Sequence, residues 1–403
     1  MKHHHHHDDD FEEVSGSAVA GRLENGKMVV ERPPTEYQKY MAEQGIPIYE
    51  APGYHDVREL ELKPWDRLGG NAAFLVPDGT VDLLGMHVIE IPPGEALAID
   101  RHIYEEKYYV VEGEGSTEVW ATGSDVCQRF EWHDGSLFAI PINTSFRLIN
   151  GGRKRCLLIV GNTSPFIMNI FENRDFVFKN DFAFTERYSG SADAYDPDFK
   201  LLKTAELQRA MWRTNLIPEI ANCELPLDNQ RSPGFRRIEP NMANGNFTTF
   251  IGHHLPGRYS KAHTHPSFAV LICIKGQGYT YNWPSGCGPT PWKDGHADQV
   301  KRVDYIAGGL VAAAPGGGNW FHQHFPTDKD GIRMLVFMGG VPNLQYQEYS
   351  GRNRRRVWVN ADLQDGGSSI SYDTEDPFIR EEYQRELAKT DIPFDMPQEV
   401  YKV

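Results

Sequence analysis

Two stretches of the sequence share one frame, and this frame decides the fold. Residues 94–113 read GEALAIDRHIYEEKYYVVEG, and residues 257–276 read GRYSKAHTHPSFAVLICIKG. Each stretch begins and ends on glycine, and position for position the paired residues are Asp100 with His263, His102 with His265, and Glu106 with Ala269. A second block follows each stretch, from Gly135 to Pro141 and from Gly309 to Pro315, with five residues between glycine and proline in both. The chain therefore contains an internal repeat.

The sequence around both frames is typical of β structure. Short runs rich in Val, Ile, Phe and Tyr alternate with Gly, Pro and Asn over residues 57–175 and again over residues 246–345. The 38 glycines and 26 prolines are spread along the chain, which favours many short strands over a helical bundle. Strands at this spacing indicate an all-β sandwich or barrel in each half.

The paired frames resemble the two sequence motifs of the cupin superfamily. This resemblance covers about half of the chain and implies an all-β fold. We therefore predict two tandem cupin barrels, also called double-stranded β-helices or jelly rolls, with short flanking helices.

The predicted domain order follows from the repeat and from what flanks it. We expect a short helix capped by Thr35 and ending near Gln44, another near Thr204 to Trp212, and a C-terminal helix from Asp376-Pro377 to Lys389. The divisions are residues 1–12, typical of a purification tag; 13–56, an N-terminal arm; 57–175, the first barrel; 176–245, a connector; 246–345, the second barrel; and 346–403, a tail.

Composition narrows the functional classes. The formal charge is −15, and there is no basic stripe, which argues against nucleic acid or an anionic membrane as a partner. No apolar run reaches about 18 residues, so no membrane span is expected. Five cysteines without a CxxC pair indicate reduced thiols, and the absence of a signal peptide pattern leads us to predict a cytoplasmic protein.

The resemblance to cupins implies that the strand with the His-x-His pattern supplies metal ligands. Residues i and i+2 of a strand face the same side, so His263 and His265 would both enter the lumen. The acid slot holds Ala269, which points to a site of three nitrogens. The usual spacing would place the third ligand at Trp320, so we infer a two-residue insertion in the glycine run 316–318; His322 then becomes the third ligand and His324 lies beside it. If this placement of the insertion is wrong, the roles of His322 and His324 are exchanged.

The first barrel departs from the ligand pattern. Its first histidine slot holds Asp100 and its late histidine slot holds Phe146, so His102 and Glu106 are left. We expect a non-catalytic barrel with a structural or interface role. The alternative is a metal site built from Asp100, His102 and Glu106.

The second barrel resembles the active barrel of gentisate and salicylate-type ring-cleaving dioxygenases. The resemblance lies in Ala262 to Ser267, Gly276 to Thr280 and Trp320 to His324. It implies an Fe(II) site of His263, His265 and His322 that takes a chelating substrate and dioxygen, with His324 as base or hydrogen-bond donor. Imidazole ligands also suit Zn, Cu or Ni, and Mn is a further possibility.

The same resemblance gives the expected substrate contacts. The family's carboxylate-binding arginine aligns with Val270, so we expect a phenolic, hydroxylated aromatic acid or diketone-like chelate, held by Arg258 or another arginine. Tyr279 would belong to an aromatic pocket wall. The function predicted is a non-heme Fe(II) dioxygenase that cleaves a C–C bond, as in degradation of aromatic compounds.

Two other readings stay open. One is a metal-dependent lyase, isomerase or decarboxylase on the same barrel; the other is a non-catalytic, ligand-binding cupin. Exposed sheet edges of such barrels need covering, so we also expect a homo-oligomer, a dimer or larger, in which the arm contributes contacts.

Overall fold

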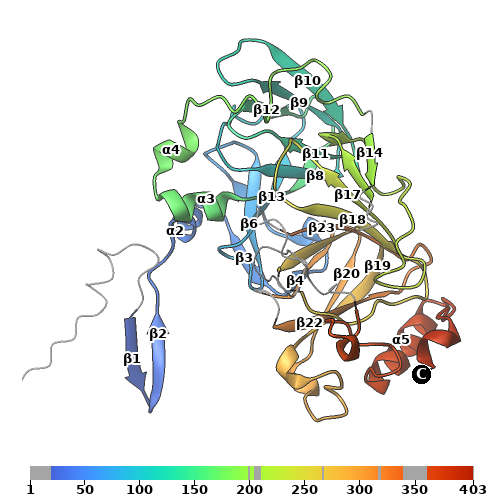
Figure 1. The fold of residues 1–403 in the computed structure, drawn as a ribbon. Coiled ribbons are helices and arrows are strands. Elements are labelled where there is room, and N and C mark those ends of the chain that lie inside the picture. The colour runs from blue at the N-terminus through green and yellow to red at the C-terminus, as the bar shows by residue number, and fades with distance from the viewer. Residues whose placement is uncertain are drawn as a thin grey trace, which may run out of the picture.

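The chain forms two β-barrels that follow one another in sequence, drawn one above the other in Figure 1. The computed structural model describes residues 20–197, 200–203, 210–265, 267–315, 319–338 and 361–402. The prediction of an all-β fold with two tandem barrels and short flanking helices is confirmed.

The first barrel is built from two antiparallel sheets. The strands of its larger sheet are β3 (Ile48–Ala51), β5 (Lys63–Pro64), β6 (Asn71–Pro77), β7 (Gly85–Ile91), β8 (Glu106–Glu112), β11 (Leu137–Ile140), β13 (Cys156–Asn162) and β16 (Leu216–Ile217). They lie in the order β16-β11-β8-β13-β7-β6-β3, with β5 beside β6, and only β3 runs parallel to its neighbour. The smaller sheet has the order β10-β9-β12, with β9 (Gly115–Trp120), β10 (Cys127–Trp132) and β12 (Ser145–Ile149).

The second barrel is organised around one long strand, β19 (Ala269–Pro284). The other strands are β4 (Gly53–Tyr54), β14 (Lys200–Lys203), β15 (Ala210–Arg213), β17 (Arg236–Asn241), β18 (Thr249–His254), β20 (Lys301–Ile306), β21 (Leu310–Ala313), β22 (Trp320–Pro326) and β23 (Ile332–Phe337). The first half of β19 pairs with β21 and β23 and its second half with β20 and β22, so it belongs to both walls of the barrel.

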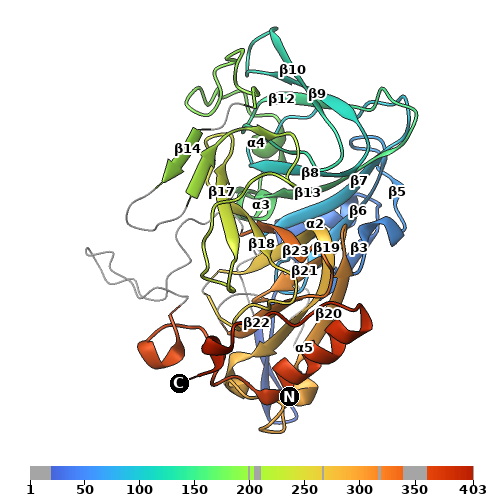
Figure 2. The same ribbon diagram turned by 90° about the vertical axis from the view of Figure 1, so that its right-hand side faces the viewer.

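Within the described residues, four α-helices and a hairpin flank the barrels. They are the hairpin β1 (Ala20–Glu24) and β2 (Lys27–Glu31), and α2 (Glu36–Glu43), α3 (Ser164–Phe171), α4 (Arg174–Phe178) and α5 (Pro377–Lys389). Short 3₁₀ turns cover Val57–Glu59, Ser285–Cys287, Ala297–Gln299, Leu363–Asp365 and Gln398–Tyr401. The hairpin stands clear of the barrels in Figure 1, whereas α5 lies along the second barrel in Figures 1 and 2.

The two helices predicted from their caps are confirmed. Thr35 accepts a hydrogen bond from the Gln38 N–H while the Gln38 side chain accepts one from the Thr35 N–H, and α2 ends at the predicted Gln44 cap. Asp376 caps α5 by accepting the Phe378 N–H at 3.0 Å, one residue before Pro377. In both cases local side-chain chemistry alone determines where the helix begins.

The arm and the connector carry strands that the sequence did not predict. In the arm, β3 extends the first sheet and β4 pairs with β21 of the second barrel. The helix expected through Trp212 is wrong at its end, because residues 210–213 form β15, which pairs in parallel with β17. Residues 204–209 lie outside the described residues. Ladder hydrogen bonds at a sheet edge outweigh the weak local helix signal at Trp212.

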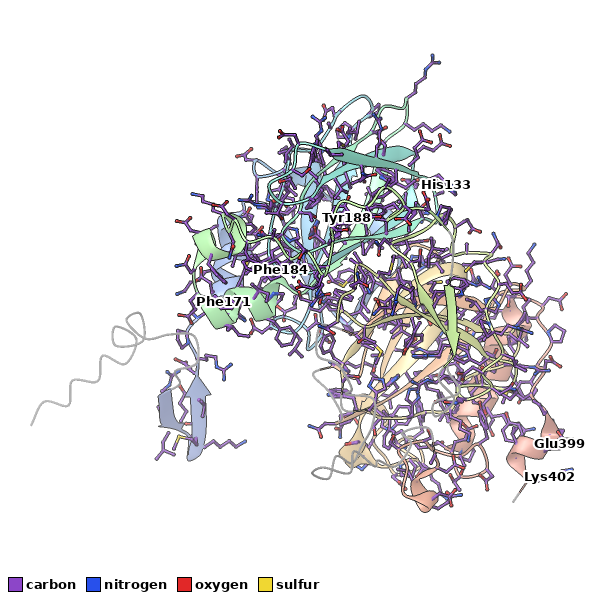
Figure 3. All side chains as sticks on the ribbon, turned by 45° about the horizontal axis from the view of Figure 1, so that its top comes forward. His133, Phe171, Phe184, Tyr188, Glu399 and Lys402 are labelled. Carbon is purple, nitrogen blue, oxygen red and sulfur yellow. The ribbon has the colours of Figure 1, made fainter. Side chains whose placement is uncertain are left out.

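Alternation along the strands divides the core into layers. Val88 and Ile159 of the first barrel share one cluster with Val270 and Phe337 of the second, whereas the neighbours Ile89 and Leu158 face the interior of the first barrel. The two large sheets therefore pack face to face, and side chains fill the space between them in Figure 3. Figure 3 also shows Phe171 at the helical edge of the first barrel and Glu399 at the far end of the second.

Candidate metal centre

His263 is held between two other segments of backbone. Its N–H donates to the His322 carbonyl, and its own carbonyl accepts the His322 N–H, both at 3.1 Å. On its other side it forms a bridge with Ser369, and the Thr264 N–H donates to the Ser368 carbonyl at 3.0 Å. The His-x-His segment is therefore fixed by β22 on one side and by the C-terminal segment on the other.

The structure brings His263, His265 and His322 together. One ring nitrogen from each lies within 4.8 Å of the others, and all three side chains are buried. Among the described residues this is the only group of three or more His, Cys, Asp or Glu side chains with such spacing. His322 comes from β22, but the strand predicted for His263 and His265 is not formed: both lie between β18 and β19, and His263 makes only isolated β-bridges there.

The hydrogen bonds of these rings fit metal ligation. Nδ1 of His263 donates to the Lys261 carbonyl at 3.1 Å, and Nδ1 of His265 donates to the Ser267 carbonyl. Each bond places the ring proton on Nδ1 and leaves Nε2 unprotonated, the usual arrangement for a metal-ligating histidine. Nδ1 of His322 is buried and has no hydrogen-bond partner among the described residues. A divalent ion between the rings fits this donor set.

Electrostatics keeps the His263 and His322 imidazoles neutral. Burial lowers the pKa of His263 and of His322 well below the usual range, and neighbouring histidines and Arg231 lower it further. A neutral imidazole is the form that binds a metal ion. His263 and His322 are therefore uncharged nitrogen donors at neutral pH.

His324 lies beside the three rings and makes a different set of contacts. It follows His322 at i+2 on β22, and the two ring centroids are 5.6 Å apart. Its Nδ1 lies 2.9 Å from the Thr280 Oγ1 atom, so Nε2 is the ring nitrogen left for the cavity. The structure thus groups His322, rather than His324, with the His-x-His pair.

A cavity opens next to the histidines. The residues that line it are Arg231, Phe235, Phe250, Gly252, His254, His263, His265, Ala269, Leu271, His322, His324, Met334, Val336 and Met338. No acidic side chain stands among the described residues on this wall, and Arg231 is its one permanently charged member. Burial and, to a smaller extent, nearby Arg237 lower the pKa of Arg231 to about 10 against the opposing effect of Asp228, so Arg231 stays cationic at neutral pH.

Two sequence-predicted residues lie outside this cavity. The Arg258 guanidinium pairs with Asp395 at 3.1 Å and donates to the Pro233 carbonyl at 3.3 Å. The Tyr279 ring stacks on Phe325 with centroids 4.5 Å apart, in the cluster that packs against α5. The expectation that they contact substrate is therefore corrected.

A β-bulge explains the orientation of Tyr279. The register of β19 against β23 shifts between Cys273 and Lys275, so one extra residue enters the strand. Before the bulge Ala269 and Leu271 face the cavity; after it, Thr280 faces inward and contacts His324. A one-residue shift reverses the two faces of a strand, and the odd-numbered aromatics then point outward.

Three residues near the cavity were missed by the sequence analysis. His254 on β18 receives or donates a hydrogen bond at 2.7 Å to Ser232, and its ring lies 6.1 Å from that of His324. Thr280 faces His324 only because the bulge reverses the two faces of β19, so simple alternation along the strand did not identify it. Arg231 comes from the connector, where no pattern marks it. Alternation along Thr249–His254 could have identified His254 once β18 was placed at the lumen.

The corresponding slot of the first barrel is occupied by its own side chains. His102 Nε2 lies 3.1 Å from Glu106, and its Nδ1 donates to the Tyr104 carbonyl at 3.0 Å. Glu106 also accepts hydrogen bonds from Tyr108 and from Asn162. A half-buried ion pair, Arg67 with Asp100, lies next to it, and the Phe146 ring packs edge-on against His102 at 5.6 Å.

Comparison with known proteins adds the following. No family model and no curated protein matches the sequence. Solved structures similar to this chain include an oxalate decarboxylase mutant from Bacillus subtilis, with 10% identity, TM-score 0.44 and coverage of 72% of this chain and 77% of that one. They also include vicilin from hazelnut, Corylus avellana (9%, 0.43, 72% and 85%), and the oxalate decarboxylase–formate complex of Lactobacillus farciminis (10%, 0.42, 71% and 86%). None of the solved structures named here is a dioxygenase.

Within the described residues, no helix is long and apolar enough to cross a bilayer.

Proposed function

We propose that this bicupin is a metal-dependent enzyme and that its second barrel is a non-heme Fe(II) dioxygenase that cleaves a C–C bond of a chelating substrate. The observation that carries the proposal is the donor set: three imidazoles, with Ala269 in the slot where other cupins place an acid. Three ligands from one side of an ion leave several positions for substrate and dioxygen. When bound, the ion supplies Lewis acidity and one-electron chemistry.

The protein's own residues would bind and orient the substrate. Phe235, Phe250 and Leu271 form an apolar wall that excludes water from the reacting atoms. Arg231 provides a positive charge on the same wall, which favours a substrate with an anionic group. An apolar acid with two chelating oxygens meets all three surfaces, so a carboxylic acid fits better than the less charged chelate suggested by Val270.

The second candidate is a metal-dependent decarboxylase or lyase on the same barrel. Arg231 favours any anionic substrate, a small carboxylic acid included. The named enzymes among the similar structures are oxalate decarboxylases. The missing acid at Ala269 speaks for the dioxygenase, because carboxylate ligands suit manganese better than a set of imidazoles alone.

The two candidates differ in what they consume and release. Full-length protein without the histidine run would be depleted of metal, reloaded with Fe(II) or with Mn(II), and tested with phenolic acids, diketones and oxalate. Oxygen uptake matched by ring- or chain-cleaved product, with Fe(II) only, supports the dioxygenase. Carbon dioxide release without oxygen uptake supports the decarboxylase, and metal binding without turnover supports a binding protein. His322→Ala is the matched control that should abolish turnover in either case.

A further inference from the structure

A chain of three buried side chains ends at the nitrogen of His324 that faces away from the cavity. Nδ1 of His324 lies 2.9 Å from Oγ1 of Thr280, and the same Oγ1 lies 2.9 Å from the Tyr305 hydroxyl. None of the three is more than 4% exposed. The chain therefore lies outside the reach of bulk water.

The β-ladders explain why these side chains meet. Thr280 on β19 is directly opposite His324 on β22, so their side chains share a face. On the other edge of β19, Tyr305 of β20 is opposite Gly278, two residues before Thr280 and on the same face. Packing, rather than chance orientation, places the two hydroxyls in contact.

The number of protons shared by Tyr305, Thr280 and His324 determines the direction in which each hydrogen bond between them is donated. Tyr305 has a single O–H, and Thr280 is the hydrogen-bond partner that the structure gives it among the described residues. If Tyr305 donates to Thr280, then Thr280 donates its own proton to Nδ1 of His324. A neutral imidazole that accepts at Nδ1 carries its proton on Nε2.

The opposite direction leaves a buried proton without an acceptor. If Nδ1 of His324 carried the proton, Thr280 would have to accept it and donate to Tyr305, and the phenol proton would have no acceptor in this chain. An unsatisfied buried donor costs about 1–3 kcal/mol. The same penalty applies to the imidazolium, since that form also carries a proton on Nδ1.

We propose that Tyr305 and Thr280 are positioning residues that hold His324 in the Nε2–H tautomer, so that His324 presents a hydrogen-bond donor to the cavity. The sequence left open whether His324 acts as base or as donor, and the hydrogen-bond chain selects the donor. In its resting state His324 would stabilise negative charge on a substrate oxygen. This use in catalysis rests on the proposed function, whereas the tautomer itself does not.

The tautomer can be measured without turnover. Full-length protein with ¹⁵N-labelled histidine would be studied by two-bond ¹H–¹⁵N NMR, metal-free and loaded with diamagnetic Zn(II). The signals of His324 are those that disappear in His324→Gln. We expect the Nε2–H pattern in the unaltered protein and in Thr280→Ser, which keeps the hydroxyl. We expect a population with Nδ1–H in Thr280→Val and in Tyr305→Phe.

Kinetics provides the second readout once a substrate is known. Loss of a preorganised donor costs on the order of 10²–10³ in kcat, so Thr280→Val should lower kcat at least about tenfold with KM nearly unchanged, and Thr280→Ser should restore most of it. An Nδ1-protonated His324 in the unaltered protein, or a tautomer that neither substitution changes, overturns the proposal. If no substrate is turned over, the proposed function fails while the NMR result still decides the tautomer.

Discussion

Glu106→Gln tests whether the first barrel replaces a metal ion with an internal ion pair. Both ring nitrogens of His102 face acceptors, because Nδ1 meets the Tyr104 carbonyl and Nε2 meets the Glu106 carboxylate. Two acceptors require two N–H groups, so His102 is an imidazolium. Glutamine has the same shape as glutamate but no charge. The substitution therefore leaves a buried cation without its anion.

The size of the effect follows from the titration of Glu106. Burial raises its pKa, but His102 and the Tyr108 hydroxyl outweigh burial and lower the pKa from 4.5 to about 2. A shift of about 2.5 units corresponds to roughly 3 kcal/mol of stability. Because the folded-state pKa is the lower one, this contribution is present above pH 4.5 and is lost as the pH falls toward 2. Breaking a buried ion pair costs a similar amount, about 3–5 kcal/mol.

Urea unfolding between pH 7 and pH 2.5 would measure both quantities. We expect Glu106→Gln to lower the unfolding free energy by about 3 kcal/mol at pH 7 and to flatten its decline below pH 4.5. Glu131→Gln, at an exposed position on β10 of the same barrel, is the matched control and should change it by less than about 0.5 kcal/mol. The metal content of both variants should equal that of the unaltered protein. A loss below 1 kcal/mol, or an unaltered slope below pH 4.5, would refute the ion-pair account.

Four further outcomes follow from the structure. His322→Ala should empty the metal site while His324→Ala keeps it loaded, as measured by metal analysis; the reverse result means that the two roles are exchanged. Removing residues 361–402 takes away the backbone beside the ligand segment and should weaken metal binding by about 10- to 100-fold, with unaltered affinity counting against this role. Deleting residues 1–34 should lower the oligomeric state in light scattering and spare metal binding, because β3 and β4 remain; a monomer before and after deletion contradicts the expected assembly. Burial lowers the pKa of Lys107 to about 7, so stability should rise from pH 7 to 10.5 in the unaltered protein and lose that rise in Lys107→Met.

The repeat frame carried most of what the sequence could predict. The fixed spacing between glycines and histidines marks equivalent positions in the two barrels, and this is why the pair His263 and His265 could be identified without coordinates, although the strand predicted for them is not formed. The third metal ligand was harder to predict, because its position depended on an insertion in the glycine run before β22. The structure groups His322 with the pair, as the two-residue insertion implies.

The misses have a common physical cause. Tyr279 was assigned to the pocket because alternate residues of a strand share a face, but the bulge between Cys273 and Lys275 reverses that alternation. Arg231 is brought to the cavity by contacts between segments far apart in sequence, as when the Lys261 N–H donates to the Arg231 carbonyl at 3.0 Å. Local patterns report neither irregular backbone nor long-range packing.

The two barrels differ in how the charge of their buried polar side chains is balanced. In the first, two carboxylates, Asp100 and Glu106, balance two cations, Arg67 and the His102 imidazolium, so the slot is neutral without any ligand. In the second, three imidazoles add no negative charge, and Arg231 on the same wall adds a positive one. A divalent ion would add two positive charges to a buried site that has no acidic side chain among its described lining residues, which is costly unless anions accompany it. The first barrel therefore has no need of an ion, while the second favours an ion together with an anionic, chelating substrate, and binding of each should strengthen binding of the other.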